Sequence, residues 1–451
     1  LSAGAQHRGQ HVDVHQLGGH GDRSGGPRSG KSLCYAIPAV LSAPGPCLAT
    51  SNKGDILDVT APIRRLDHPN GRIWTFDPER IADPNRKSAP WVWDLIASVQ
   101  SIADAKRIAD CWRYASGQPS TGGDDFFPGT AAQQLADYLF AAHLGGRSVS
   151  DVFRWCSNER DTSPADILSE YPRYAGIASR VSSVIALTPE TRSGVFGSLQ
   201  TMVAFLADPE IIDWIDPHRD TEGNIDERRG LFDPYEFATS EDTLYLLSAQ
   251  GRPSTALTAS LTAVVAFTAF QRAQSEFTGN NRRLPVPLCC VLDEAANICR
   301  WPELADVYSY FGSAGIPIMT IWQNPDQGRA AFGETNFGSL FNNANITVYL
   351  GGIKDAKFLG EISQLVGQRE IVRGSVNIDG TGRRSVNNSI QKENILDVSD
   401  LTEWPVGRAL LLASQSRAQI VKTLPWTGNR QWADALTQAK AKAREEQRKA
   451  A

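Results

Sequence analysis

The feature that most constrains this chain is a glycine-rich run at residues 25–32 that matches the pattern G-x-x-x-x-G-K-[ST]. Glycines in such a run let backbone N–H groups converge on phosphate oxygens, and a helix that begins just beyond adds its dipole. Lys31 supplies a charge for the β- and γ-phosphates, and Ser32 offers a hydroxyl to Mg²⁺. The competing interpretation is a glycine-rich surface turn. The residues predicted to bind the nucleotide are Gly25, Gly26, Pro27, Arg28, Ser29, Gly30, Lys31 and Ser32.

The sequence before this run does not look like the buried strand that normally precedes a phosphate-binding loop. Residues 18–24 consist mainly of glycine and of polar or charged side chains, which are unfavourable in a central strand. Residues 1–24 also contain four of the seven histidines, a composition that can bind metal but is more typical of a loose chain end. We therefore expect a disordered or corrupted N-terminus over residues 1–24. Either the first strand is badly degraded, or the true upstream sequence is missing or misread.

A second half of the same site is predicted far along the chain. Residues 286–292 are apolar and end in Asp293 and Glu294, which indicates a buried strand with two carboxylates at its carboxyl end. Asp293 would hold Mg²⁺, and Glu294 would orient the attacking water. Residues 315–322 form another apolar run, and Gln323 after it can contact the γ-phosphate or that water. Each run alone would be an ordinary strand end, but together with the phosphate-binding loop they predict an ATPase.

Several sequence blocks, taken in their order and spacing, resemble the TraG/TraD-type coupling proteins of conjugative and type IV secretion systems. The resemblance covers residues 25–426. Two features depart from the family pattern, namely the absent first strand and the absent N-terminal membrane segment, and both lie at the same end. The blocks that carry the resemblance are Gly26–Ser32, Ala49–Asp55, Trp74–Pro78, Trp91–Leu95, Asp293–Ile298 and Asn342–Ala344.

The resemblance implies a RecA-like P-loop NTPase of the α/β class, with a mainly parallel central sheet and an all-α inserted domain. It implies ATP and Mg²⁺ as cofactors. The implied partners are DNA with its bound relaxase and the components of the type IV secretion channel. The resemblance also implies a homo-oligomer, a hexameric ring, in which a neighbouring subunit supplies an arginine finger. Arg252, Arg300 and Arg329 are candidates that the sequence does not rank.

The pattern of apolar residues divides the chain into regions. Residues 25–95 and 216–430 show strand and helix signals and are predicted to form the nucleotide-binding domain. Residues 96–215 show helical spacing without a convincing strand, so we expect an all-α inserted domain there. In the resembled family this domain is implicated in substrate recognition, and a structural lid is the alternative. Residues 431–451 predict a charged C-terminal helix or tail.

A basic hairpin is predicted within residues 368–390, around Asp379-Gly380. In a ring that moves DNA, a hairpin with few acidic residues would carry the charge that a DNA-facing loop needs. A solvated hairpin without such a role is the alternative. The candidate DNA-facing residues are Arg369, Arg373, Arg383 and Arg384.

The composition excludes several classes of protein. Hydrophobic residues make up 41% of the 451, enough for a sizeable core, which excludes wholesale disorder. The net charge of −5 excludes a uniformly basic DNA binder. The seven cysteines are odd in number and form no C-x-x-C pair, which fits a reducing compartment better than a disulfide framework or a zinc ribbon.

Two uncharged stretches could be mistaken for membrane segments. Residues 32–52 and 253–271 lack charge, but Pro in the first and Ser or Thr in the second interrupt them, so both are predicted to be pieces of a folded core. The chain begins with Leu and contains Met only at Met202 and Met319. We therefore expect a fragment, a processed chain or an unusual start codon. The resemblance implies that the full-length protein lies at the cytoplasmic face of the bacterial cell membrane, attached through an N-terminal segment that this chain lacks.

The leading functional hypothesis is a DNA-stimulated ATPase that translocates DNA and couples the relaxosome to a type IV secretion channel. Two alternatives stay open. One is a DNA translocase of the FtsK/HerA kind, against which the helical insertion argues. The other, from a different class, is an adaptor or remnant that binds secretion partners but cannot use nucleotide because its first strand is missing.

Overall fold

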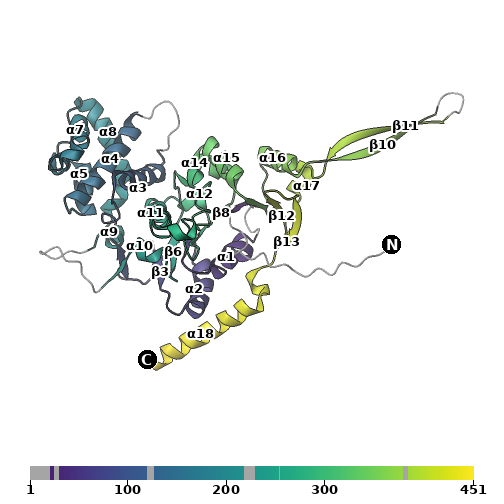
Figure 1. Cartoon of the computed structure of the whole chain (residues 1–451), viewed down its shortest axis with the longest axis horizontal. Coiled ribbons are helices and arrows are strands. Elements are labelled where there is room, and N and C mark those ends of the chain that lie inside the picture. The colour runs from purple at the N-terminus through teal and green to yellow at the C-terminus, as the bar shows by residue number, and fades with distance from the viewer. Residues whose placement is uncertain are drawn as a thin grey trace.

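The computed structural model describes residues 21–24, 30–118, 126–217, 229–252, 254–378 and 384–450. A sheet of nine strands forms the centre of the molecule (Figure 1). Seven neighbouring strands are parallel, and the last two at one edge run antiparallel to their neighbours. The order is β13 (Gln419–Lys422), β12 (Arg408–Ala413), β9 (Ile346–Tyr349), β1 (Gly21–Ser24), β8 (Ile318–Trp322), β7 (Cys289–Leu292), β2 (Cys47–Ser51), β6 (Thr243–Leu247) and β3 (Ile73–Phe76). The expected α/β class with a mainly parallel sheet is confirmed.

The first strand corrects one expectation. Residues 21–24 form β1, which pairs in parallel with β8 on one side and with β9 on the other. The prediction that residues 21–24 belong to a disordered or corrupted terminus is therefore wrong, and of the two alternatives for the first strand, the structure has a degraded strand. The reason is that a central strand is held by main-chain N–H and C=O groups, and two flanking strands can pair with a polar sequence as well as with an apolar one. Residues 1–20, including the histidine-rich tract, lie outside the described residues.

Helices cover both faces of the sheet. On one face, a helix that begins at Lys31 with a π-helical turn continues as α1 (Ile37–Leu41) and packs with α2 (Asp55–Asp67) against strands β2, β7 and β8. On the other face, α11 (Ser254–Glu276) and α12 (Ala295–Ile298) pack against alternate residues of the same strands. Strands β2, β6 and β7 are buried along their whole length, as is typical of parallel strands covered on both faces.

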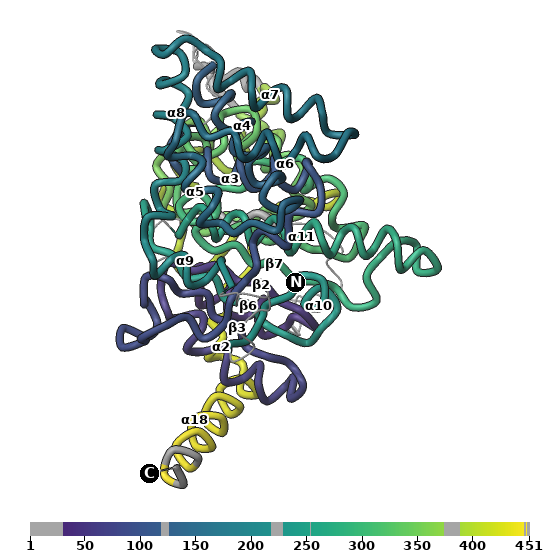
Figure 2. The backbone as a smooth tube through the Cα atoms, turned by 90° about the vertical axis from the view of Figure 1, so that its left-hand side faces the viewer, coloured from purple at the N-terminus to yellow at the C-terminus, as the bar shows by residue number. Residues whose placement is uncertain are grey.

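Between β4 (Trp91–Trp93) and β5 (Gly230–Phe232), which pair in a separate two-stranded sheet, the described residues form only helices and turns. Figure 1 and Figure 2 show these helices gathered at one end of the molecule. Arg107 links this helical region to the rest, because its guanidinium lies 3.5 Å from the ring centre of Phe267 and 2.9 Å from Glu303. The helices are α3 (Ile102–Ala115), α4 (Phe126–Leu144), α5 (Val149–Ser157), α6 (Ser163–Ser169), α7 (Ala175–Ile185), α8 (Pro189–Val203) and α9 (Pro209–Ile215).

The C-terminal part adds two projections. A long hairpin of β10 (Gln368–Ile378) and β11 (Arg384–Asn394) extends away from the body at the end opposite the helical region (Figure 1). The predicted C-terminal helix is α18 (Arg430–Ala450), which packs against α2 through Leu436 before it extends outward. The remaining helices are α10 (Pro234–Phe237), α13 (Leu304–Val307), α14 (Pro325–Phe332), α15 (Glu334–Asn343), α16 (Ala356–Val366) and α17 (Val398–Thr402).

Among the described helices, α11 is long and apolar enough to cross a membrane, and the bent pair α8–α9 passes the same test only if it is taken as one span. In α11, 78% of the apolar window is buried inside the protein. This burial agrees with the prediction that residues 253–271 belong to a folded core.

Candidate nucleotide site

The topology of the sheet brings the predicted site residues together at the carboxyl ends of the parallel strands. Strands β1, β8 and β7 are consecutive neighbours and parallel, so their carboxyl ends lie side by side. The helix with Lys31 and Ser32 follows β1, Gln323 follows β8, and Asp293 with Glu294 follows β7. Of the predicted phosphate-binding run, Gly30, Lys31 and Ser32 are described, and residues 25–29 lie outside the described part.

The loop turns into its helix at Gly30. This residue has a φ of +81°, a left-handed conformation that glycine adopts without the steric cost of a Cβ. Its carbonyl accepts a 2.8 Å hydrogen bond from the Cys34 N–H, which begins the helix. Lys31 is 8% exposed, and burial lowers the pKa of its ammonium while the carboxylates of Glu294 and Asp293 act in the opposite direction. The buried Lys31 ammonium therefore lies close to the carboxylates of Asp293 and Glu294, at the carboxyl ends of the strands.

Asp293 is held where a metal ligand is expected. Ser32 donates a 3.2 Å hydrogen bond from Oγ to Asp293 Oδ2, and Thr50 Oγ1 donates a 2.8 Å bond to the Asp293 carbonyl. The residue is 4% exposed, so burial, followed by the charge of Glu294, raises its pKa to about 7, whereas Lys31 and Ser32 oppose the shift. The positive charge of Lys31 therefore compensates only part of the cost of burying this carboxylate.

A divalent cation fits this arrangement. Asp293 Oδ1 is buried without a hydrogen-bond partner, and its other oxygen contacts the Ser32 hydroxyl. Mg²⁺ is commonly bound through one or two protein oxygens together with substrate phosphates and waters. No cluster of three or more His, Cys, Asp or Glu side chains suited to a metal occurs in the described ranges. The Ser32–Asp293 pair is therefore suited to a cation that is shared with phosphate groups.

Both carboxylate oxygens of Glu294 accept hydrogen bonds from amide side chains. Asn297 donates from Nδ2 to Oε2 at 2.7 Å, and Gln323 donates from Nε2 to Oε1. Glu294 itself adopts a left-handed backbone conformation, with a φ of 55°, and its carbonyl accepts from the Asn297 and Ile298 N–H groups at the start of α12. The expected neighbourhood of Glu294 and Gln323 is observed. Asn297 was not identified from the sequence, although its position one helical turn after Glu294 was the available signal.

The candidate arginine fingers differ in their surroundings. Arg329 is engaged by three carboxylates, at 2.9 Å from Asp326, 3.3 Å from Glu334 and 2.5 Å from Asp355. Arg300 is partly buried and donates to the Ala296 carbonyl at 3.2 Å. Arg252 is exposed in the loop after β6, at the same edge of the sheet as the site.

Hydrogen bonds to Glu79, a residue that follows β3, hold the loop that carries Arg252. The Glu79 carboxylate accepts from the Ala249 N–H at 2.9 Å and from the Ser254 N–H at 3.4 Å. Glu79 thereby fixes both ends of the loop and leaves the Arg252 side chain in solvent.

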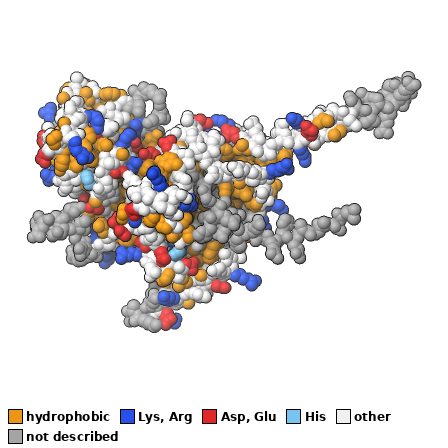
Figure 3. Space-filling view, viewed as in Figure 1, with side chains coloured by type: hydrophobic (Ala, Val, Ile, Leu, Met, Phe, Trp, Pro, Cys, Tyr) orange, Lys and Arg blue, Asp and Glu red, His pale blue; other side chains and the backbone are white. Residues whose placement is uncertain are grey.

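The candidate DNA-facing arginines lie on the projecting hairpin, away from the nucleotide site. Arg369 and Arg373 are on one set of alternating positions, and Arg384 pairs with Ile378 on the other set. Arg373 forms an ion pair with Glu393, so part of its charge is compensated. Arg383 lies outside the described residues. Figure 3 shows the near part of the hairpin reaching out from the body with basic, acidic and apolar side chains on its surface.

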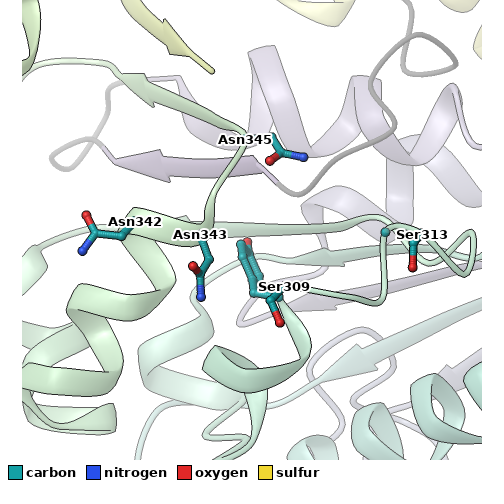
Figure 4. A pocket seen from close by; sticks show the side chains of 7 residues that line it. Ser309, Ser313, Asn342, Asn343 and Asn345 are labelled. Carbon is teal, nitrogen blue, oxygen red and sulfur yellow. The ribbon is translucent and has the colours of Figure 1, made fainter. Parts of the chain in front are cut away.

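A hollow of about 320 Å³ lies at the amino ends of strands β8 and β9 (Figure 4). Its lining precedes β8 and β9 rather than following them, so it is not part of the nucleotide site. The lining carries no formal charge and consists of Tyr308, Ser309, Gly312, Ser313, Asn342, Asn343 and Asn345.

Comparison with known proteins agrees with this geometry. Residues 287–406 match the family model described as the TraM recognition site of TraD and TraG. No curated protein sequence matches the chain. The family match includes β7 with its two carboxylates, Gln323 and the hairpin. Over residues 287–406, the resemblance to TraG/TraD-type coupling proteins is therefore confirmed.

Solved structures with a similar fold include the bacterial conjugative coupling protein TrwBdeltaN70 in an unbound form, at 16% identity and a TM-score of 0.61. They also include the plasmid coupling protein TrwB in complex with ADP and Mg²⁺ and with the ATP analogue ADPNP, each at 15% identity and a TM-score of 0.60. Each similarity covers 90% of this chain and 85% of the other chain. The expected RecA-like P-loop fold is confirmed.

Proposed function

We propose that this chain is an ATP-hydrolysing, DNA-translocating coupling protein that links transferred DNA to a type IV secretion channel. The observation that carries the proposal is the contact between Ser32 and Asp293, which are separated by 261 positions and meet beside Lys31. This contact brings together three parts of an ATPase site at the carboxyl ends of the strands: the phosphate-binding turn at Gly30, Asp293 as a metal ligand and Glu294 as the residue that orients water. TrwB, which shares the fold, binds ADP with Mg²⁺ and the ATP analogue ADPNP, which supports ATP as the substrate here.

Each residue of the site has a separate role in the proposed hydrolysis. The Gly30 turn and the N–H groups of the helix after it bind phosphate oxygens, and the Lys31 ammonium neutralises charge on the β- and γ-phosphates. Ser32 and Asp293 would hold Mg²⁺, which when bound supplies further positive charge to the phosphates. Glu294 accepts the proton of the attacking water, and Gln323 lies between the phosphate-binding loop and Glu294 to contact the γ-phosphate.

The same proposal includes the oligomer, the partners, the cellular location and the roles of the domains. In a hexameric ring, ATP would lie between subunits, and Arg252 is the best-placed finger because it is exposed at the site edge, whereas Arg329 is engaged by three carboxylates. The hairpin arginines would contact the DNA backbone, and relaxase and channel components would be the protein partners. The full-length protein would lie at the cytoplasmic face of the membrane. The regions at residues 25–95 and 216–430 would form the motor and residues 96–215 the substrate-recognition domain.

The test is ATP hydrolysis with and without DNA. We expect DNA to stimulate hydrolysis by the wild-type chain, and Lys31→Ala to abolish it, because the Lys31 ammonium lies beside the two carboxylates and would neutralise phosphate charge. Lys440→Ala is the matched control, since Lys440 is exposed on α18 and the charge change is the same. Hydrolysis that DNA does not stimulate, or that survives Lys31→Ala, contradicts the proposal. A chain that binds no nucleotide by calorimetry favours the adaptor alternative.

A further inference from the structure

The exposed Arg252 belongs to a loop whose backbone is fixed on both sides of this residue. The Arg252 N–H donates to the Ala249 carbonyl at 3.2 Å, and the Arg252 carbonyl accepts from the N–H and the hydroxyl of Thr255 at 3.2 and 2.8 Å. Gly251, the third residue of this turn, has a φ of +72°, a conformation that a type II turn requires at that position. The backbone of Arg252 is therefore held in one place, although its guanidinium lies in solvent.

Glu79 holds this loop on the side of the outermost strand of the sheet. Its carboxylate accepts from the Ala249 N–H at 2.9 Å, from the Ser254 N–H at 3.4 Å and from the Ser254 hydroxyl. Glu79 follows β3, which is the last strand in the order of the sheet and pairs with β6. The loop after β6 is thus bound on the side that faces away from β2 and β7.

Asp77 in turn fixes the turn that carries Glu79. Asp77 is 1% exposed, and its carboxylate accepts from the Ile81 and Ala82 N–H groups at 2.6 and 2.9 Å. Within this turn, Arg80 adopts a left-handed conformation with a φ of 56°. A non-glycine residue persists in that conformation only where the surrounding contacts determine it. Glu79 is therefore a firmly placed acceptor and not a mobile surface side chain.

These contacts keep Arg252 away from the nucleotide site of its own chain. In the sheet, β2, β7 and β8 separate β6 from β1. Neighbouring strands lie about 4.8 Å apart, so the four spacings place the end of β6 about 19 Å from the phosphate-binding turn after β1. An arginine side chain in a loop held on the side of β3 does not span that distance. A phosphate group that Arg252 contacts must therefore belong to another molecule.

We propose that Glu79 is a positioning residue, which holds the loop at residues 249–254 so that Arg252 meets the nucleotide bound by a second copy of this chain. This inference rests on the proposed ATPase function and adds a residue to it. The Arg252 guanidinium, which lies in solvent in its own chain, has donors available for two-point hydrogen bonding of a phosphate group. Glu79 touches neither substrate nor phosphate and acts only through Arg252.

The positioning role is tested by ATP hydrolysis in the presence of DNA for Glu79→Ala, Arg252→Ala and the double variant. We expect kcat to fall about 100-fold in Glu79→Ala, the scale of a group displaced by about 1 Å, with KM for ATP within about twofold of wild type. In Arg252→Ala we expect a loss of about 1,000-fold. The double variant should be no slower than Arg252→Ala, because Glu79 has no role once Arg252 is absent.

Two further variants separate this role from a general loss of structure. Glu79→Gln keeps an oxygen for the Ala249 N–H and should retain most of the activity. Glu361→Ala is the matched control, because Glu361 is exposed on α16. Glu79→Asp, which is one methylene shorter, replaces Glu79→Ala in the cycle if circular dichroism shows that the alanine variant does not fold. A normal kcat in either single variant of the cycle, or losses that multiply in the double variant, overturns the positioning role.

The second test determines whether Arg252 acts between two copies of the chain. Lys31→Ala, which keeps Arg252 but lacks the charge for the phosphates, is mixed with Arg252→Ala, which keeps the nucleotide site. We expect the mixture to be at least about tenfold more active than either variant alone, because the intact site of one copy then meets Arg252 of the other. A mixture that is no more active than its components overturns the contact with a second copy and leaves the proposed ATPase intact. A wild-type chain that hydrolyses no ATP overturns both.

Discussion

The buried carboxyl of Asp293 leads to a prediction that separates stability from activity: Asp293→Asn abolishes hydrolysis and stabilises the ligand-free protein. Asp293 is 4% exposed, and its Oδ1 has no hydrogen-bond partner. Burial, followed by the charge of Glu294, raises its pKa from 3.8 to about 7, so the ionised form disfavours the folded state. Asparagine carries no charge, and its amide oxygen can still accept the bond from Ser32.

The sign of the pH dependence follows from the raised pKa. The penalty is absent below about pH 4, where the carboxyl is protonated in both folded and unfolded chains, and it is complete above about pH 7. One pKa unit corresponds to about 1.4 kcal/mol, so the shift from 3.8 to about 7 sets an upper bound of about 4 kcal/mol. An unpaired buried amide N–H in the variant costs about 1 to 3 kcal/mol. We expect a net stabilisation of about 1 to 3 kcal/mol at pH 8.

The assay is urea unfolding with EDTA present, at pH 8 and at pH 4.5, for the wild type and Asp293→Asn. The variant should unfold at higher urea concentration at pH 8 and lose that advantage at pH 4.5. Asp434→Asn on α18, where the side chain is exposed, is the control and should match the wild type at both pH values. A variant that is no more stable at pH 8, or that is equally stabilised at both pH values, refutes the reasoning.

Three further predictions concern the loop and the hairpin. Gly30→Ala should weaken ATP binding measured by calorimetry about tenfold, since a left-handed alanine costs about 1–2 kcal/mol; unchanged affinity would show that the turn is not under conformational constraint. Burial raises the pKa of the Cys34 thiol, so iodoacetamide should modify it slowly at pH 8, and more slowly still with ATP bound at the neighbouring Gly30; labelling that ATP does not affect would place the nucleotide elsewhere. Replacing Arg369 and Arg373 together by Ala should reduce the slope of log affinity for DNA against log salt by about 0.7–0.9 for each phosphate that the hairpin no longer neutralises, and should spare hydrolysis without DNA; an unchanged salt slope favours the solvated-hairpin alternative.

The strand ends of the site could be predicted because they leave a strong local pattern. An apolar run that ends in Asp293 and Glu294, and another that ends in Gln323, indicate buried parallel strands whatever their neighbours are. The sheet then brings the two ends together. Strand β1 could not be predicted in the same way, because its polar sequence carries no strand pattern and its pairing depends on β8 and β9, which lie hundreds of residues later.

The contacts of Glu294 also escape prediction, for a different reason. Its hydrogen bonds to Asn297 and Gln323 depend on a left-handed backbone at Glu294, a conformation that no side-chain pattern signals for a non-glycine residue. On the hairpin, a run of arginines predicts a basic surface. The register decides that Arg384 belongs to the other set of alternating positions. It also places Glu393 opposite Arg369, on the same face as Arg373, with which Glu393 forms an ion pair, and register is a property of two strands together.

The central position of β1 also affects how the chain is synthesised and folded. Gly21 pairs with Met319 and with Ile346, so β1 is made before both of its partner strands and finds its place only after they have emerged. Pairings this distant in sequence close slowly, because a large loop entropy is lost before any hydrogen bond forms. The gap between β8 and β9 therefore stays open on a nascent chain, with two unpaired strand edges exposed to other chains. Nucleotide binding should thus appear last in biogenesis, and a chaperone that shields these edges should raise the yield of protein able to bind nucleotide.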